Sequence, residues 1–167
     1  ATVTCPATYM THDVKLEMKS TAKLDVQADL TIGNELYMTG DAKLTQSGQS
    51  VVTVGTKLHL SALYEISEQA QLVVNGRINC RIPGALTIED TSSVLAATDS
   101  EMHGILTYIL GPSGTGLLSV TGHFLIGNMA KLVVDASAYS SGAATIPLVQ
   151  YTSKSGSFDP SDVNFAP

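Results

Sequence analysis

Apolar residues of this chain recur in three columns with a period of ~20–22 residues, a spacing typical of stacked structural repeats. Polar residues alternate with them, and alternation of this kind indicates β-strands. The first column is Leu24, Leu44, Tyr64, Leu86 and Leu106; the second is Leu30, Val52, Leu72, Val94 and Leu118; the third is Met38, Leu60, Cys80, Met102 and Phe124. The pattern predicts an all-β fold, a three-sided right-handed parallel β-solenoid of about six rungs with terminal caps.

An antiparallel β-sandwich is the competing interpretation, because it too contains many short alternating strands. The turn signals favour the solenoid, since Gly33-Asn34 and Asn75-Gly76 fall between columns, where a rung turns a corner. A sandwich would also not keep three columns in register over five periods. We expect a single domain, with residues 1–20 as an N-terminal cap, 21–150 as the rungs and 151–167 as a C-terminal cap. Caps are needed because a terminal rung exposes unpaired backbone groups.

The fifth rung contains an insertion, Gly111-Pro112-Ser113-Gly114-Thr115-Gly116, which is typical of a protruding turn. This insertion explains why the second column takes a longer step, from Val94 to Leu118. The segment lacks the Gly-Lys-Ser/Thr ending of a phosphate-binding loop. We therefore expect a corner at this place in the chain and no nucleotide cofactor.

The charge of the chain argues against one class of partner. Its net charge is −6 at pH 7 and its pI is about 5.0, whereas nucleic-acid binding needs clustered Lys and Arg. No apolar run approaches the ~20 residues of a membrane-spanning helix. The chain begins at Ala1 without Met or a signal segment, which is typical of a secreted protein after cleavage. We expect an extracellular or cell-surface protein that binds no nucleic acid and has no membrane span.

The two cysteines leave one question open. A secreted chain favours a disulfide between Cys5 and Cys80. The columns, however, place Cys80 inside a middle rung, whereas Cys5 precedes the first rung, and a disulfide requires Cα atoms that lie close together. Both pairing and two free thiols are compatible with the sequence. The spacing Cys-x2-Cys is absent, so no zinc knuckle is expected.

The segment from Leu132-Val133-Val134-Asp135 to Gly156-Ser157-Phe158-Asp159 resembles the repeats of autotransporter passenger domains. Residues 22–159 as a whole resemble a short right-handed parallel β-helix of the pectin-lyase-like or autotransporter-passenger kind. The resemblance is architectural and includes no family-specific catalytic motif. It implies the fold, and an analogy of fold alone carries little information about function.

The register of the columns predicts which side chains point outward together. On the third face, the expected outward column is Tyr37, His59, Asn79, Glu101 and His123. One flank carries Glu35, Lys57, Arg77, Asp99 and Thr121, and the other carries Thr39, Ser61, Arg81, His103 and Leu125. Neighbours along a column are expected ~4.8 Å apart, within reach of direct hydrogen bonds.

Two interpretations of this third face are open. Its charges can pair between rungs, Glu35 with Lys57 and Arg77 with Asp99, and each pair would contribute at most ~1 kcal/mol while setting the register. Alternatively, the face is a polar groove for a glycan, because sugars bind to flat rings and to forked donors and acceptors. The candidate ligand-binding residues are Tyr37, His59, Asn79, Arg81, Glu101, His103 and His123.

Catalysis and metal binding are weaker alternatives for the same face. Glu101 beside His103 and His123 is a candidate acid–base pair, but a surface Glu next to a His is commonplace. These three side chains match no known metal-ligand spacing. Asp99 and Glu101 are expected ~6–7 Å apart, which is not diagnostic of a glycosidase. We therefore predict no catalytic residue, no metal and no cofactor.

The other two faces differ from the third. The outward column of the second face is flat, uncharged and rich in methyl groups, and contiguous apolar surface is seldom left in water. We expect self-association through this column, in particular through Thr31, Thr53, Val73 and Leu95. The first face carries charged and Thr side chains and is expected to be a solvated wall.

Together these patterns favour a non-enzymatic extracellular β-solenoid with a structural or adhesive role, contacting glycans or identical subunits. The alternative is a polysaccharide-binding module, or a short polysaccharide-active enzyme, that uses the column from Tyr37 to His123. The expected partners are accordingly a polysaccharide or further copies of the chain.

Overall fold

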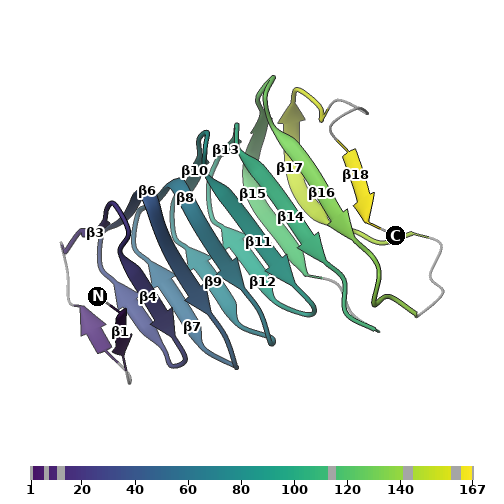
Figure 1. Ribbon diagram of the computed structural model, residues 1–167. Coiled ribbons are helices and arrows are strands. Elements are labelled where there is room, and N and C mark those ends of the chain that lie inside the picture. The colour runs from purple at the N-terminus through teal and green to yellow at the C-terminus, as the bar shows by residue number, and fades with distance from the viewer. Residues whose placement is uncertain are drawn as a thin grey trace.

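The computed structural model describes the backbone of residues 2–5, 8–10, 14–112, 116–140, 145–158 and 163–166, and the side chains of residues 14–112, 116–140 and 145–158. Within these ranges the chain forms 18 strands of a single sheet and no helix. Figure 1 shows the strands stacked along one axis, from the N-terminal to the C-terminal end. The pairing is parallel throughout, and the sheet coils into a β-solenoid of about five turns. The predicted fold class is confirmed.

Each turn of the solenoid contributes a strand to each of three faces, and the longest strands bend from one face to the next. The first face contains β1 (Thr2–Cys5), β4 (Lys23–Val26), the second halves of β6 (Glu35–Gln46) and β8 (Lys57–Ile66), β11 (Ala85–Glu89), β14 (Ile105–Ile109), β16 (Lys131–Asp135) and β18 (Val163–Ala166). The second face contains β2 (Thr8–Met10), β5 (Leu30–Ile32), β7 (Val51–Val54), β9 (Gln71–Val74), β12 (Ser93–Ala96) and the first halves of β15 (Leu117–Ile126) and β17 (Val149–Ser155). The third face contains β3 (Leu16–Met18), the first halves of β6 and β8, β10 (Arg77–Cys80), β13 (Ser100–Met102) and the second halves of β15 and β17.

The first two columns of the sequence are stacks of directly paired residues. Leu44 is opposite Leu24 on one side and Tyr64 on the other, and the pairing continues through Leu86 to Leu106. The second column pairs in the same way, through Leu72, as far as Leu118. All of these side chains are buried, so the two predicted columns form the interior, and the hydrophobic effect favours their register.

Gln46 is a buried polar residue in this interior. Its side chain is 1% exposed, and the Tyr64 hydroxyl donates to its Oε1 over 2.8 Å. The Gln46 amide nitrogen in turn donates to the backbone oxygens of Ser50, at 3.0 Å, and Gln71, at 2.9 Å. A buried polar side chain is tolerated when its groups are paired. This network ties two successive rungs together inside the solenoid.

The third column is confirmed as far as Met102, but its last predicted step is wrong. Phe124 lies opposite Ser100, and it is Ile126 that lies opposite Met102. The insertion before Leu118 gives the cause. Because the extra residues precede the second face, the step from Val94 to its partner Leu118 is longer than the step from Leu72 to Val94. The later residues of that rung keep this longer step, so that the partner of Met102 is Ile126 and not Phe124.

The strands near the two ends of the chain continue the solenoid. β1, β2 and β3 pair in parallel with β4, β5 and β6, and β17 and β18 pair with β15 and β16. The described strands before residue 20 and after residue 148 thus belong to the same sheet as the rungs between them.

Cys80 is a free thiol buried on β10. The backbone of Cys5 pairs with Val26 on the first face, whereas Cys80 belongs to the third face. Cys80 therefore forms no disulfide, which settles the question that the sequence left open. Burial raises the pKa of the Cys80 thiol to about 12, so the thiol is protonated at neutral pH and is a poor nucleophile.

Candidate functional site

The third face gathers cationic side chains on an otherwise acidic molecule. Six of the nine Lys and Arg residues lie on it or at its edges: Lys15, Lys19, Lys57, Arg77, Arg81 and Lys154. Four of the 15 carboxylates lie there: Glu17, Glu35, Asp99 and Glu101. The six cations outnumber the four carboxylates on this face, although the chain as a whole has a net charge of −6. An anionic or hydroxyl-rich ligand is favoured here over the other surfaces.

Tyr37 and His59 form a closed stack on this face. Their ring centroids are 4.3 Å apart, with an angle of 14° between the ring planes. The Lys15 ammonium lies 4.6 Å from the Tyr37 centroid, on the side of β3, whereas His59 approaches from β8. A stacked ring and a cation occupy the ring faces that a sugar would contact. The platform that the sequence predicts for a glycan is thus covered by the protein's own side chains.

The same end of the face holds a compact group of charges. The Glu17 carboxylate is 2.8 Å from the Lys15 ammonium and 2.7 Å from that of Lys19. Hydrogen bonds from these two lysines lower the pKa of Glu17 to about 2. All three side chains are exposed, so the pairs satisfy one another without adding much to stability.

The pKa of His59 lies below its usual value of 6.5, because the ring is partly buried and because Lys57 and Arg81 repel its charged form. As the pH falls, His59 is therefore protonated at a higher pH in the unfolded chain than in the folded one. The stability that the neutral ring contributes is present above pH 6.5 and is lost as the pH falls through the lowered pKa of the folded state.

We expect His59→Phe, which keeps a ring against Tyr37 but cannot be protonated, to lose less thermal stability than the wild type on acidification. Melting temperatures of both proteins from about pH 7.5 to about pH 5 measure the difference. Other titrating groups are common to both proteins and cancel in the comparison. Parallel melting curves for the two proteins across this range would contradict the assigned role of His59.

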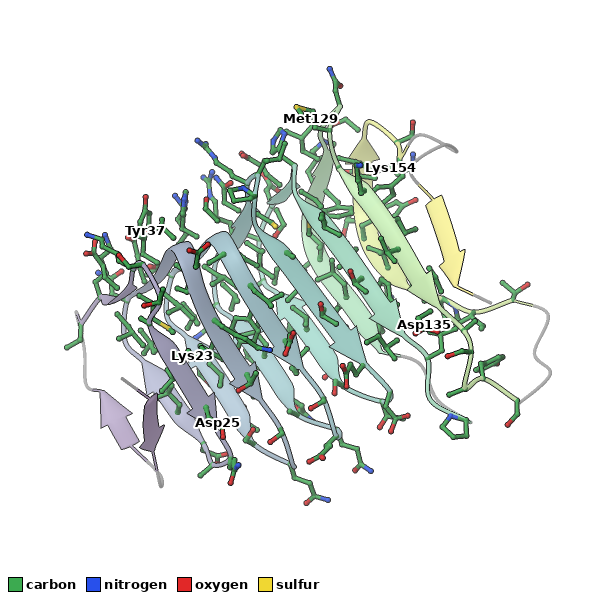
Figure 2. All side chains as sticks on the ribbon, in the orientation of Figure 1. Lys23, Asp25, Tyr37, Met129, Asp135 and Lys154 are labelled. Atoms are coloured by element: carbon green, nitrogen blue, oxygen red, sulfur yellow. The ribbon has the colours of Figure 1, made fainter. Side chains whose placement is uncertain are left out.

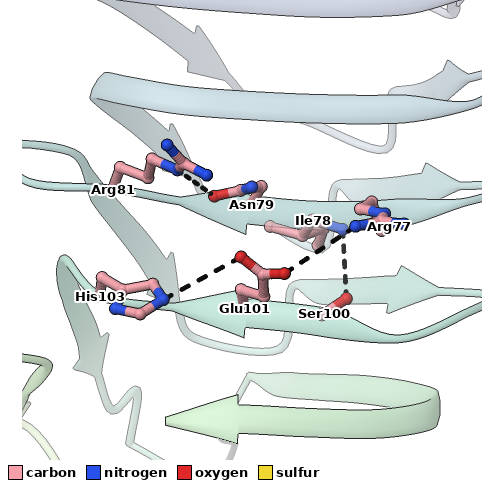
Figure 3. Close-up of polar contacts among 7 residues, drawn as sticks. All are labelled: Arg77, Ile78, Asn79, Arg81, Ser100, Glu101 and His103. Atoms are coloured by element: carbon pink, nitrogen blue, oxygen red, sulfur yellow. Dashed lines mark hydrogen bonds and ion pairs between the residues drawn. The ribbon is translucent and has the colours of Figure 1, made fainter. Parts of the chain in front are cut away.

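Arg77, Asn79, Arg81, Glu101 and His103 lie on β10 and β13 or directly after these strands, and we call them the Arg–Glu cluster (Figure 3). Arg81 Nε donates to Asn79 Oδ1 over 3.1 Å. The Glu101 carboxylate lies 3.8 Å from Arg77 Nη1 on one side and 4.0 Å from His103 Nε2 on the other. The Glu101 carboxylate therefore lies between one guanidinium group and one imidazole, and the second guanidinium group, that of Arg81, is held by Asn79 on the neighbouring rung.

The members of the Arg–Glu cluster differ in exposure. Asn79 is only 3% exposed, so it orients Arg81 and is not itself the contact surface. Arg77 has 54% of its side chain exposed, and Arg81 is also exposed. Glu101 retains 30% and His103 37% exposure. A ligand on this face would meet the two arginines, the carboxylate and the imidazole.

His123 lies away from this cluster, in contrast to the prediction. The residue opposite Glu101 is Leu125, and His123 pairs with Ser153. Both ring nitrogens of His123 are hydrogen-bonded to hydroxyls, with Nδ1 2.9 Å from Ser153 Oγ and Nε2 2.8 Å from Ser155 Oγ. The displacement of His123 has the same cause as that of Phe124, namely the offset that the insertion passes along the rung.

The predicted charge pairs between rungs are partly replaced. Glu35 and Lys57 are neighbours in register. Arg77 is paired with Glu101 instead of Asp99, whose Oδ1 accepts a hydrogen bond from the His123 amide over 2.7 Å. These contacts involve exposed side chains and contribute a few tenths to ~1 kcal/mol each, so they leave the cluster free to serve a ligand.

The second face has the predicted outward column. Thr31, Thr53, Val73, Leu95 and Ser119 are paired in that order along the axis. Leu95 is 40% exposed, and the remaining members are half-buried. The strip is uncharged, short-chained and flat.

Comparison of the chain with models of protein families, with curated proteins and with solved structures gives no match. Among the described residues, no group of three or more His, Cys, Asp or Glu side chains is placed to hold a metal ion. A search of the same part of the chain finds no helix long and apolar enough to cross a membrane. Function is therefore inferred from the geometry of the third face.

Sequence reasoning misses two contributors to this face. It assigns Arg77 only to a register-setting pair with Asp99, yet Arg77 contacts Glu101. It places Leu125 on a flank, yet this residue occupies the outward column beside Glu101. The sequence does contain the signal that locates Leu125. If the longer step from Val94 to Leu118 is also applied to Glu101, it leads to Leu125.

Proposed function

We propose that this chain is a non-enzymatic extracellular β-solenoid with a structural or adhesive role that contacts glycans through the Arg–Glu cluster of its third face. The observation that carries the proposal is the composition of that cluster. Forked donors from Arg77 and Arg81 stand on either side of Asn79 and one rung from the acceptor Glu101, on a rigid parallel sheet.

The chemistry of these groups suits a sugar. Each guanidinium offers several N–H donors in a fixed plane, and the carboxylate accepts through two oxygens. Neighbouring sugar hydroxyls both donate and accept, so a donor fork beside a carboxylate can bind a pair of them. Because Asn79 already holds Arg81, less side-chain freedom is lost on binding. A face with a regular rung spacing also fits a ligand that is itself a repeating polymer.

Adhesion is favoured over catalysis by the environment of Glu101. This carboxylate lies 3.8 Å from the Arg77 guanidinium and is 30% exposed, so its oxygens are placed to accept hydrogen bonds from a ligand. Asp99 binds the His123 amide, so it does not face Glu101 as the second carboxyl group of a glycosidase would. The polysaccharide-active enzyme is therefore the second choice.

Self-association through Thr31, Thr53, Val73 and Leu95 remains a proposal of lower rank. A strip of five rungs spaced by ~4.8 Å and about 10 Å wide covers roughly 250 Å². A stable dimer buries about 800 Å² on each partner. The strip alone is thus too small for a lasting contact, and we propose that it acts only where many copies are held together.

The glycan proposal is tested by binding to an array of bacterial, plant and animal glycans. We expect specific binding by the wild type, and a loss of tenfold or more in Glu101→Ala and Arg81→Ala, since a hydrogen bond to a charged group contributes about 1.5–3 kcal/mol. His59→Ala is expected to change affinity by less than about threefold, because His59 stacks on Tyr37 and does not belong to the Arg–Glu cluster.

Lys23→Ala, which removes an exposed cation from the first face, is the matched control for charge. It should bind like the wild type. Binding that survives both Glu101→Ala and Arg81→Ala would remove the third face as the site. A wild type that binds no glycan on the array would contradict the proposal as a whole.

A further inference from the structure

A hollow of about 420 Å³ opens at the edge of the third face, next to the Arg–Glu cluster. Its volume lies within the range of small-ligand sites. Three apolar side chains form much of its wall, of which Ile82 is 50% and Met129 66% exposed; Leu125 is the third. Figure 2 shows Met129 at the outer margin of the solenoid. The hollow is thus open to solvent, and a ligand that covers its apolar side chains would be stabilised by the hydrophobic effect.

His103 connects the hollow to the cluster. Its Nε2 faces Glu101 at 4.0 Å, and the same ring lines the hollow. The ring lies against the backbone of Gly127, because a Cβ at residue 127 would be 2.0 Å from His103 Nδ1. A glycine at this position therefore makes room for the imidazole at the boundary between the polar and the apolar surface.

The change from polar to apolar occurs within one rung. Leu125 lies directly opposite Glu101 in the outward column, at the usual strand spacing of ~4.8 Å. A ligand that binds the carboxylate through hydroxyls thus places its next substituent over Leu125. That substituent meets Met129 and Ile82 on the far side.

We infer that the glycan bound by the Arg–Glu cluster is acetylated, and that the hollow binds its acetyl group. The inference rests on the proposed function and specifies the class of ligand. An acetyl group combines a methyl, which fits against Leu125 and Met129, with a carbonyl oxygen that accepts a hydrogen bond. The side chains of His103 and Asn128 line the hollow and can donate to this oxygen, whereas the Ser155 hydroxyl is already hydrogen-bonded to His123.

An acetylated ligand explains the hollow better than a purely hydroxylated one. A hydroxyl in contact with Leu125 and Met129 would lose its hydrogen bonds to water without replacement. A purely apolar ligand would make no use of the donors of Arg77 and Arg81 or of the acceptor Glu101 one rung away. The juxtaposition of both surfaces selects a ligand that is polar at one end and carries a small apolar group at the other.

The test is a set of oligosaccharides in matched pairs, in which one member carries an N-acetyl group where the other carries a hydroxyl. We expect the wild type to bind the acetylated members roughly tenfold more tightly, as is usual for one small apolar group in a fitted site. Leu125→Ser and Met129→Ser should reduce this preference to about twofold or less while leaving affinity for the hydroxyl members unchanged. Calorimetric titration of the two members of each pair gives the ratio.

Leu95→Ser is the matched control, since it replaces another outward leucine, on the second face, and should keep the full preference. Gly127→Ala is a second probe, because a methyl there has to displace His103; it should lower the preference without changing the melting temperature greatly. Equal affinity of the wild type for both members would overturn the acetyl inference and leave glycan binding intact. A preference that persists in Leu125→Ser and Met129→Ser would show that the acetyl group binds elsewhere.

Discussion

The Leu72→Asp variant is expected to be unfolded. Leu72 is 0% exposed and lies between Val52 and Val94 in the second column. Loss of such a side chain costs about 2–5 kcal/mol, and burial of a carboxylate without a partner costs several more. The sum is comparable to the whole stability of a typical domain, about 5–15 kcal/mol. Circular dichroism should show no cooperative thermal transition in this variant.

Leu95→Asp is the matched control for this experiment. Leu95 also lies on the second face, one rung further along and pointing outward, with 40% exposure. Its replacement should change stability by less than about 1 kcal/mol. A Leu72→Asp protein that melts like the wild type would show that the register is wrong, and the assignments to the third face would fall with it.

Gln46→Leu is expected to destabilise the protein by about 2–4 kcal/mol, although the new side chain is apolar and of similar size. The change leaves the Tyr64 hydroxyl without its acceptor and the backbone oxygen of Gln71 without the amide donor. The Tyr64 side chain is 0% exposed and the bond to the Gln71 oxygen is partly buried, and each unpaired group costs about 1–3 kcal/mol. Chemical denaturation with unchanged slope gives the difference in the free energy of unfolding.

A double-mutant cycle isolates the contact between Gln46 and Tyr64. Tyr64→Phe alone leaves Gln46 Oε1 unpaired and should cost about 1–2 kcal/mol. The double variant Gln46→Leu with Tyr64→Phe should cost less than the two single changes together, because the second change removes a group that the first has left unpaired. Strict additivity would contradict a direct hydrogen bond between the two side chains.

The fold was predictable because the solenoid interior is periodic. Leu44 and Leu72, like the other members of their columns, face inward because each lies opposite an inward-facing residue of the neighbouring rung. The repeat length is nearly constant, so this alignment recurs from rung to rung. Outward residues up to Glu101 followed directly from the same alternation. The general composition of the third face was therefore readable before the structure.

The geometry of the site was not predictable to the same extent. The stacking of Tyr37 on His59 depends on their side-chain rotamers. A column in the sequence predicts that the two residues are neighbours, but it does not predict how their rings are oriented. That Asn79 would be buried under its neighbours depends on how Arg81 folds back over it. The hollow beside His103 is formed by corner residues such as Ile82 and Met129, which belong to no column.

Two glycines outside the interior decide which chemistry the outer surface presents. A β-strand turns the same side inward every second residue, so sliding β15 by two positions along β13 would keep Phe124 inside. The apolar columns accept either alignment. The backbone packs closely at Gly122, where a Cβ would be 2.3 Å from Asp99 Oδ1, and at Gly127, where it would be 2.0 Å from His103 Nδ1. After such a slide Val120 and Leu125 would take these places, so the glycines exclude the alternative and keep a leucine, and not a histidine, next to Glu101.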